Sequence, residues 1–508
     1  MATAARNFDM ASARPSWAGR LHDLCAAIDA RPHLVLPFAI ALYLAVFVPV
    51  AQRPLWYDEI STFHVAKSPT LGHFIACLTS VELSPPLQFV FVRLSMALFG
   101  ESPLAVRLPS LLAFLAGSLI LFRIAWQRFG GGVALATLGL FWAMAPGAMA
   151  VEARPYGLLM GFFAAALYCW LAAQNEIRWS HWHAGLLLSI TAMFLTHCFS
   201  PFYAMAIGIG ELVRIWQRKR LDWPVWLAIL APLTVLPSYL PLLRTAKSVV
   251  FPDALQVTAL TPVMFYIGML TPVALAAILI LIFGIRGAGK TLPAPLWTFA
   301  IAALTGPFLI MAYSAVSRVP FWNRYGSPAG VAMALVLAAL LAKWANGRPA
   351  ISVSVSAVVF TLFAVTQAGT PALMAPFEGT NTGYRQIEPS LPLVTASGLS
   401  FLEMDLREPE TVARRVVYLT DREAAIRYRQ FTIFEGLADV QKVFPLRAKV
   451  AAYRDFTRDT RRFLVLTRPE SMDDWLLDQA RADGAKPQLL WDKKTPYRDH
   501  QLYEVHLP

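Results

Sequence analysis

Residues 34–59 read LVLPFAIALYLAVFVPVAQRPLWYDE, and this stretch decides the fold. Its apolar part, residues 34–51, is about as long as a helix must be to cross a bilayer. The acidic pair Asp58 and Glu59 follows after six more residues. Two carboxylates are costly to keep near lipid, so we expect them to face water, substrate or a metal. The stretch therefore predicts a membrane protein with a polar site at the mouth of its first span.

Composition places the whole chain in the same class. Of its 508 residues, 57% are apolar, and the mean hydropathy is +0.51. The net charge of +12 lies entirely in the first 374 residues, which hold 24 basic and 12 acidic side chains. We attribute this excess to the loops of a membrane protein, so it does not indicate nucleic-acid binding. Four scattered cysteines predict neither a disulfide framework nor a zinc site.

The apolar runs predict a mainly α-helical, polytopic membrane domain over residues 34–370. We expect eleven spans, at about 34–51, 104–125, 132–150, 155–174, 182–198, 201–216, 223–243, 262–285, 294–316, 326–345 and 350–369. Residues 1–33 are expected to form a mobile cytoplasmic tail. The first span has one alternative reading, a signal peptide, but its lead is long and no small-x-small cleavage site follows it.

The basic residues orient these spans. With a cytoplasmic N-terminus, 15 of the 24 basic residues fall on the inside, nearly all beside span ends. The positive-inside rule then puts the C-terminus outside. Residues 52–103 become one long outer loop. Its apolar segment 86–99 is too short to span and is interrupted by Arg93, so we expect interfacial helices there.

A separate domain is predicted over residues 375–508, where 20 basic and 20 acidic residues balance. Short β-rich runs occur at 415–419, 462–466, 487–491 and 502–505. An amphipathic helix capped by Ser471 is expected over 470–482. These patterns favour a small extracytoplasmic α/β domain.

The predicted outer face collects the polar chemistry of the membrane domain. Carboxylates can accept a proton from a nucleophile or bind a divalent cation. Arginines suit phosphate groups because their guanidinium is planar and always charged. The mixture favours group transfer to or from a phosphorylated lipid. The residues placed there are Asp58, Glu59, Glu82, Arg107, Glu152, Arg154, His197, Arg318 and Arg324.

Five short motifs follow one another along this face. They are Trp56-Tyr57-Asp58-Glu59, Ser84-Pro85-Pro86-Leu87, Val106-Arg107-Leu108-Pro109-Ser110, Glu152-Ala153-Arg154-Pro155-Tyr156 and Asn323-Arg324-Tyr325. The ordered set resembles the GT-C glycosyltransferases, specifically bacterial relatives of the protein O-mannosyltransferases and of the aminoarabinose and galacturonosyl lipid A transferases. The resemblance covers about residues 34–370.

The resemblance implies an integral membrane glycosyltransferase of the bacterial inner membrane. Its donor would be a sugar on a polyprenyl phosphate, and its acceptor a glycolipid, glycan or protein hydroxyl on the periplasmic face. Asp58 would be the general base of an inverting transfer, with Glu59 supporting it. Arg107 and Arg324 would stabilise the leaving phosphate. The remaining substrate-binding candidates are Glu152, Arg154 and Tyr325.

A divalent metal, Mg²⁺, Mn²⁺ or Ca²⁺, stays an open alternative, with Glu82 as its candidate ligand. In the aminoarabinose transferases a metal-linked Glu lies two residues before the prolines, whereas Glu82 lies three before them. The Asp that those enzymes carry in the second outer loop is replaced by Tyr156.

Two other functions compete with a glycosyltransferase. A transporter or flippase of lipid-linked sugars predicts inverted repeats and a midplane ionisable site, but the sequence shows neither. A phosphoethanolamine-type transferase predicts a set of His and Asp metal ligands, and no such set is visible.

Overall fold

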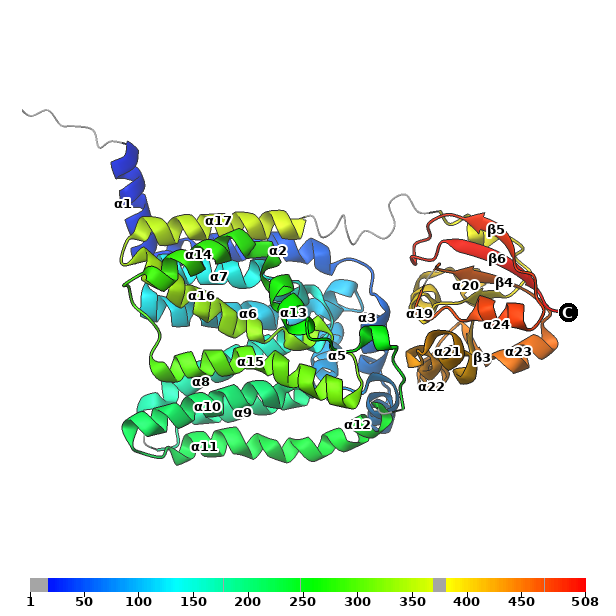
Figure 1. Cartoon of the computed structure of the whole chain (residues 1–508), viewed down its shortest axis with the longest axis horizontal. Helices are drawn as coiled ribbons and strands as arrows, with labels where there is room; N and C mark the ends of the chain where they lie inside the picture. The colour runs from blue at the N-terminus through cyan, green and yellow to red at the C-terminus, as the bar shows by residue number, and fades with distance from the viewer. Residues whose placement is uncertain (1–16, 177, 247, 369–380, 470) are drawn as a thin grey trace, which may run out of the picture.

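The computed structural model describes residues 17–176, 178–246, 248–368, 381–469 and 471–508 (Figure 1). A bundle of long helices fills the first part of the chain, and a compact domain with a β-sheet follows it. This arrangement confirms a mainly α-helical polytopic protein with a small C-terminal α/β domain.

Helices occur at all eleven predicted spans. They are α2 (Leu36–Ala51), α6 (Pro103–Phe129), α7 (Gly131–Ala143) with η3 (Ala145–Val151), α8 (Pro155–Ala172), α9 (His181–Thr196), α10 (Ser200–Arg218), α11 (Trp223–Leu230) with η5 (Ala231–Tyr239) and α12 (Leu240–Ala246), α13 (Thr261–Leu270) with η7 (Thr271–Val273) and α14 (Ala274–Arg286), α15 (Ala294–Ser317), α16 (Ala329–Ala345) and α17 (Pro349–Ala368).

Not all of these helices meet the length and hydropathy expected of a span. Among the described residues, seven do so, or eight if α7 and η3, bent by 72°, count as one. Helices α9 and α16 have only 16 and 17 residues, and α10 carries Glu211, Arg214 and Arg218. Burial against neighbouring helices compensates for their shortness or polarity.

Helices α6 and α8 pack closely on one another. A Cβ on Gly117 of α6 would come within 3.0 Å of the Gly161 Cα on α8. Small residues let membrane helices approach in this way. Residues Arg107 on α6 and Arg154, just before α8, are thereby brought to the same end of two packed helices.

The N-terminal prediction needs a correction. Residues 1–16 of the expected tail lie outside the described residues, but α1 (Trp17–Ala30) is a helix that packs against α17 and α7. The Asp29 carboxylate accepts a hydrogen bond of 2.7 Å from the Gly132 amide. This part of the chain is therefore attached to the bundle. The short 3₁₀ turns η1 (Pro32–Leu34), η4 (Ala173–Asn175) and η6 (Asp253–Leu255) complete the connections of the bundle.

The loop between α2 and α6 is helical throughout most of its length. It contains α3 (Tyr57–Ala66), α4 (Leu71–Cys77), the π-helical turn η2 (Leu78–Glu82) and α5 (Leu87–Phe99). With 13 residues, α5 is too short to span a bilayer. In Figure 1, α3 and α5 lie at the end of the bundle that faces the C-terminal domain.

The C-terminal domain is built on a six-stranded sheet in the order β3-β2-β1-β4-β6-β5. Strands β1 to β4 pair in parallel, whereas β4, β6 and β5 pair antiparallel. Register is fixed by pairs such as Val394↔Val417 and Val394↔Val465. The strands are β1 (Leu393–Thr395), β2 (Val416–Thr420), β3 (Lys449–Ala452), β4 (Arg462–Thr467), β5 (Gln488–Asp492) and β6 (Gln501–His506).

Helices connect and cover these strands. They are η9 (Gly383–Gln386), α19 (Gly398–Arg407), α20 (Glu410–Ala413), α21 (Arg422–Arg429), η10 (Ile433–Gly436), α22 (Leu437–Val443), α23 (Tyr453–Asp459) and α24 (Leu476–Ala482). All four predicted strands are present. Residue 470, where the predicted helix 470–482 starts, lies outside the described residues. The observed helix α24 begins at Leu476, and the Ser471 hydroxyl bonds the Asp473 carboxylate instead of capping a helix.

Candidate active site

Helix α3 begins at Tyr57, so both carboxylates of the acidic pair lie in its first turn. Trp56 is extended, with φ −96° and ψ 173°, and its amide donates 3.2 Å to Glu59 Oε2. A side chain that returns to the first amides of a helix stabilises its start. Successive residues on a helix point about 100° apart. Asp58 and Glu59 therefore have different surroundings.

Glu59 faces into the protein and is fully buried. Its Oε1 accepts 2.8 Å from Arg107 Nε and 2.9 Å from the Ala153 amide. Arg107 Nη2 pairs with the other carboxylate oxygen, and neither side chain has any exposed surface. A buried charge is tolerated only when it is paired and hydrogen-bonded. Both conditions are met here.

The remaining N–H groups of Arg107 donate to backbone carbonyl oxygens. Nη1 donates to the carbonyls of Ala51 and Arg53 over 2.8 and 2.5 Å, and Nη2 donates 3.1 Å to that of Pro54. No donor of Arg107 is left facing an open surface. The expectation that Arg107 binds a substrate phosphate finds no support in this arrangement.

Asp58 faces the other way, toward two arginines. Its Oδ2 lies 2.9 Å from Arg324 Nη1 and 3.7 Å from Arg154 Nε. The side chain of Asp58 is 17% exposed. Its second oxygen, Oδ1, accepts no hydrogen bond from any residue that the structure describes. Asp58 is thus anchored through one oxygen and has the other available.

Arg154 bridges Asp58 to a third carboxylate. Its Nη1 lies 3.1 Å from Glu82 Oε2 and 3.3 Å from the Asp58 carbonyl oxygen. Burial alone would lower the pKa of Arg154, but Asp58 and Glu82 outweigh it and raise that pKa. The guanidinium is therefore a fixed positive charge between the two acids.

Glu82 reaches Arg154 through an unusual backbone. It ends the π-helical turn η2, and Leu83 after it is left-handed, with φ 53° and ψ 34°. A π turn takes up one residue more than an α turn, and it often occurs at functional sites. A bulky residue in the left-handed region is strained.

Glu152 lies beside these charges without an ion-pair partner among the described residues. Burial, with Glu59 close by, raises the pKa of Glu152 to about 7. Arg53, Arg324 and Asp58 also lie within electrostatic reach of it. At neutral pH this carboxyl group is thus divided between its acid and its anion.

Arg324 lies on η8 (Asn323–Gly326), and its side chain lies between two aromatic rings. Its guanidinium lies 5.9 Å from the Trp56 ring centre and 5.8 Å from that of Trp322, within cation–π range. The ring of the next residue, Tyr325, packs on the His197 ring, with 5.7 Å between the ring centres. Burial, with Arg154 and Arg324 nearby, lowers the pKa of His197 to about 3, so His197 is neutral.

The donor set does not fit a metal ion. Arg154 occupies the space between Asp58 and Glu82. In the part of the chain that the structure describes, no group of three or more His, Cys, Asp or Glu side chains is arranged to hold a cation. The structure thus offers Glu82 an arginine as its partner and no ligand set for Mg²⁺, Mn²⁺ or Ca²⁺.

Except for Arg318, which is exposed after α15, the site residues expected from the sequence gather at this end of the bundle, in two layers. Glu59 and Arg107 form the buried layer, and the other residues surround Asp58. The sequence did not indicate Gln88, whose Nε2 donates 2.5 Å to the Ala153 carbonyl and so holds the loop before Arg154. It also gave no sign that the Tyr57 ring meets Phe434 of the C-terminal domain, at 5.4 Å.

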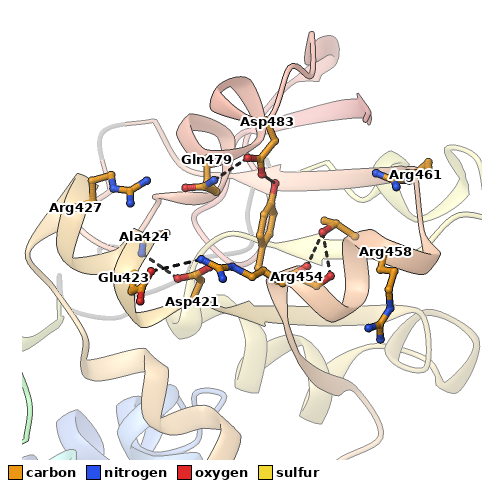
Figure 2. A pocket seen from close by; sticks show the side chains of 11 residues that line it. Asp421, Glu423, Ala424, Arg427, Arg454, Arg458, Arg461, Gln479 and Asp483 are labelled. Atoms are coloured by element: carbon orange, nitrogen blue, oxygen red, sulfur yellow. Dashed lines mark hydrogen bonds and ion pairs between the residues drawn. The ribbon is translucent and has the colours of Figure 1, made fainter. Parts of the chain in front are cut away.

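Two other cavities lie away from Asp58. One of about 360 Å³ is in the C-terminal domain, between α21, α23 and α24. Figure 2 shows that the guanidinium groups of Arg427, Arg458 and Arg461 point apart there, so they form no common anion site. The second, about 340 Å³, is lined by Glu211, Arg214 and Arg218 at the opposite end of the bundle.

Comparisons with known proteins bear on the fold. Residues 84–242 match the family model of dolichyl-phosphate-mannose-protein mannosyltransferase. Over the 94% of the chain that the structural comparison covers, the architecture is the GT-C fold, which is the fold implied by the motif resemblance.

Two solved structures share this architecture along nearly their whole length. Both are crystal structures of ArnT from Cupriavidus metallidurans, one bound to undecaprenyl phosphate and one in the apo state. The first has 14% identity and a TM-score of 0.57, and the second 13% and 0.55. Each comparison covers 94% of this chain and 98% of the other. No curated protein matches the chain by sequence.

Proposed function

We propose that this protein is a glycosyltransferase that moves a sugar from a polyprenyl-phosphate donor to an acceptor hydroxyl at the outer face of the inner membrane. The observation that carries the proposal is the contact of Asp58 with Arg324 and Arg154 at the mouth of the bundle. A carboxylate with one free oxygen lies there beside two fixed cations. Transfer away from a phosphate needs a base and a stabilised leaving group, and this site supplies candidates for both.

The donor class is supported from two directions. The ArnT structure with the same fold was solved with undecaprenyl phosphate bound. In this chain, Arg324 is 25% exposed and its guanidinium is held between two tryptophans. An arginine in this setting suits a phosphate group through paired N–H donors. We assign the donor phosphate to Arg324, with Arg154 behind it.

The transfer step uses the free oxygen of Asp58. Oδ1 accepts the proton of the acceptor hydroxyl, and the acceptor oxygen forms a bond to the anomeric carbon. The bond from that carbon to the phosphate oxygen breaks on the opposite side, and the electron pair leaves with the polyprenyl phosphate. The configuration at the anomeric carbon is therefore inverted. Arg324 stabilises the negative charge that gathers on the leaving phosphate.

Donor binding would also prepare the base. In the structure, Arg324 is bonded to Asp58 Oδ2 over 2.9 Å. The donor phosphate competes for the same guanidinium, so its arrival draws Arg324 away from Asp58. Oδ2 would then be released from Arg324 while Oδ1 stays free, so both carboxylate oxygens would be open to the acceptor once the donor has bound.

Glu59 and Arg107 have a positioning role in this proposal. They lie beneath Asp58, fully buried and bonded to one another and to the backbone on both sides of the site. Glu152 and Tyr325 line the sugar side. We place the N-terminus in the cytoplasm and the C-terminal domain in the periplasm, as the distribution of basic residues favours.

The test is a transfer assay with purified protein. A labelled polyprenyl-phosphate sugar is supplied with an extract of cell-envelope glycolipids, and both the released polyprenyl phosphate and the labelled product are measured. Asp58→Asn is the matched inactive variant. A flippase would move the labelled donor across proteoliposomes without releasing polyprenyl phosphate. Movement without release would overturn the proposal. If transfer is observed, the glycolipid profile of a deletion strain would identify the acceptor.

A further inference from the structure

One short segment before α3 is held from two sides. Arg107 of the membrane domain accounts for three of its carbonyls, those of Ala51, Arg53 and Pro54. The next carbonyl, that of Leu55, accepts from Arg407 Nη2 at the C-terminal end of α19. Residues 51–57 are therefore fixed by one arginine from each domain.

The second arginine is itself held in place. Arg407 Nη1 lies 3.2 Å from Glu403 Oε2, one helical turn earlier, and both side chains are only 16% exposed. Burial raises the pKa of Glu403. The positive charges of Arg407 and Arg498, and a hydrogen bond from the backbone amide of Tyr57, lower it in part. Glu403 thus faces the first residue of α3. The helices α19 and α3 pack directly on one another.

Further contacts keep the C-terminal domain from shifting relative to this segment. His73 Nε2 on α4 lies 2.8 Å from the Val443 carbonyl oxygen. Thr432 and Val250 exchange two hydrogen bonds, of 3.1 and 2.8 Å. Arg422 donates 2.7 Å to the Ser248 carbonyl. The domain is fastened to the membrane domain at several points, so α19 has a fixed place beside α3.

We propose that Arg407 and Glu403 are positioning residues for Asp58, which makes the C-terminal domain a working part of the site. Asp58 is the second residue of α3, and the carbonyl that Arg407 binds lies three residues before it. A change in that carbonyl's place rotates or translates the first turn of α3, and with it the Asp58 carboxylate. Displacement of a reacting group by about 1 Å can cost about 100-fold in rate.

The proposal rests on the proposed function for its rate measurement but not for its structural one. Arg407→Met keeps the length and apolar stem of the side chain and removes its donors. The matched control is Arg414→Met, because Arg414 is 74% exposed and pairs with Glu410 on the surface. Hydrogen exchange over residues 52–62 and the kcat and KM of transfer are measured for both variants and the wild type.

We expect Arg407→Met to speed exchange of the first α3 amides about 10-fold, because the hydrogen bond that holds the segment before them is gone and local opening becomes easier. Its kcat should fall about 10- to 100-fold, with the KM for donor within about 3-fold of wild type. Exchange and kcat equal to those of Arg414→Met would overturn the proposal. If the wild type transfers no sugar, the proposed function fails, but the exchange measurement still decides whether Arg407 fixes α3.

Two further variants cover the case in which Arg407→Met does not fold. Arg407→Lys keeps a positive charge and one donor for the Leu55 carbonyl, so its kcat should lie between those of wild type and the methionine variant. Glu403→Gln loosens Arg407 without removing it and should give a smaller loss of kcat. Wild-type kcat and exchange in both of these folded variants would count against a positioning role.

Discussion

Arg107 Nε lies 2.8 Å from Glu59 Oε1, and both side chains are completely buried beneath the first turn of α3. This buried ion pair has a structural role. Changing either residue would leave the charge of the other buried without a partner. The pair also bonds the backbone of α2's end and of Ala153, on the two sides of Asp58.

Removing one member of this pair should destabilise the protein. Glu59→Gln leaves the Arg107 charge buried without a counterion, which costs about 3–5 kcal/mol. We expect a clear fall in the thermal midpoint of the detergent-solubilised protein, with lost activity as a consequence. The double variant Glu59→Gln/Arg107→Met should recover part of that loss. A Glu59→Gln protein as stable as wild type but inactive would show that Glu59 takes part in the chemistry.

Asp58→Asn should have the opposite profile. The amide keeps the shape of the side chain and can still accept from Arg324, but it cannot take a proton. We expect the rate of transfer to fall about 100-fold or more, with the thermal midpoint close to wild type. Asp439→Asn, at an exposed pair with Lys442, is the control. Near-normal turnover in folded Asp58→Asn would remove Asp58 as the base.

The choice of phosphate ligand is tested by Arg324→Lys. Lysine keeps the charge but loses the planar fork and the stacking between Trp56 and Trp322. We predict a KM for the donor raised about 10-fold. Arg318→Lys is the matched control, because Arg318 ends α15 nearby, is exposed and has no ion pair among the described residues. Equal donor use by wild type and Arg324→Lys would place the phosphate elsewhere.

Glu152 should make stability depend on pH. Its pKa is raised from the usual range to about 7 by burial and by Glu59. The folded state therefore binds the proton more tightly than the unfolded state does, and the stability present below about pH 4.5 is lost as pH rises through about 7. Glu152→Gln cannot titrate. Its thermal midpoint should gain on wild type between about pH 5 and pH 8, and a constant difference across this range would contradict the assignment.

The sequence indicated where the charges gather but not which of them pair. Charge bias and motif order placed Asp58, Arg154 and Arg324 on one face, although 266 positions separate Asp58 from Arg324. Partner choice depends on the direction of each side chain around its helix. The Arg107 side chain points to Glu59, whereas the sequence had suggested that Arg107 binds a phosphate. In the C-terminal domain, β1 and β3 have only three and four residues, too few for an alternating pattern to register.

The last prediction concerns a metal. Several carboxylates so close together must be protonated, bridged by a cation or paired with arginine. The structure shows the third arrangement, with Arg154 between Asp58 and Glu82 at 3.7 and 3.1 Å. Transfer by the purified enzyme should therefore survive treatment with a chelator. Glu82→Gln should lower the rate by loosening Arg154, and added divalent cations should not change that effect. Activity that chelation abolishes, and that Mg²⁺, Mn²⁺ or Ca²⁺ restores where monovalent salt does not, would mean that Arg154 moves aside and that Glu82 is a ligand.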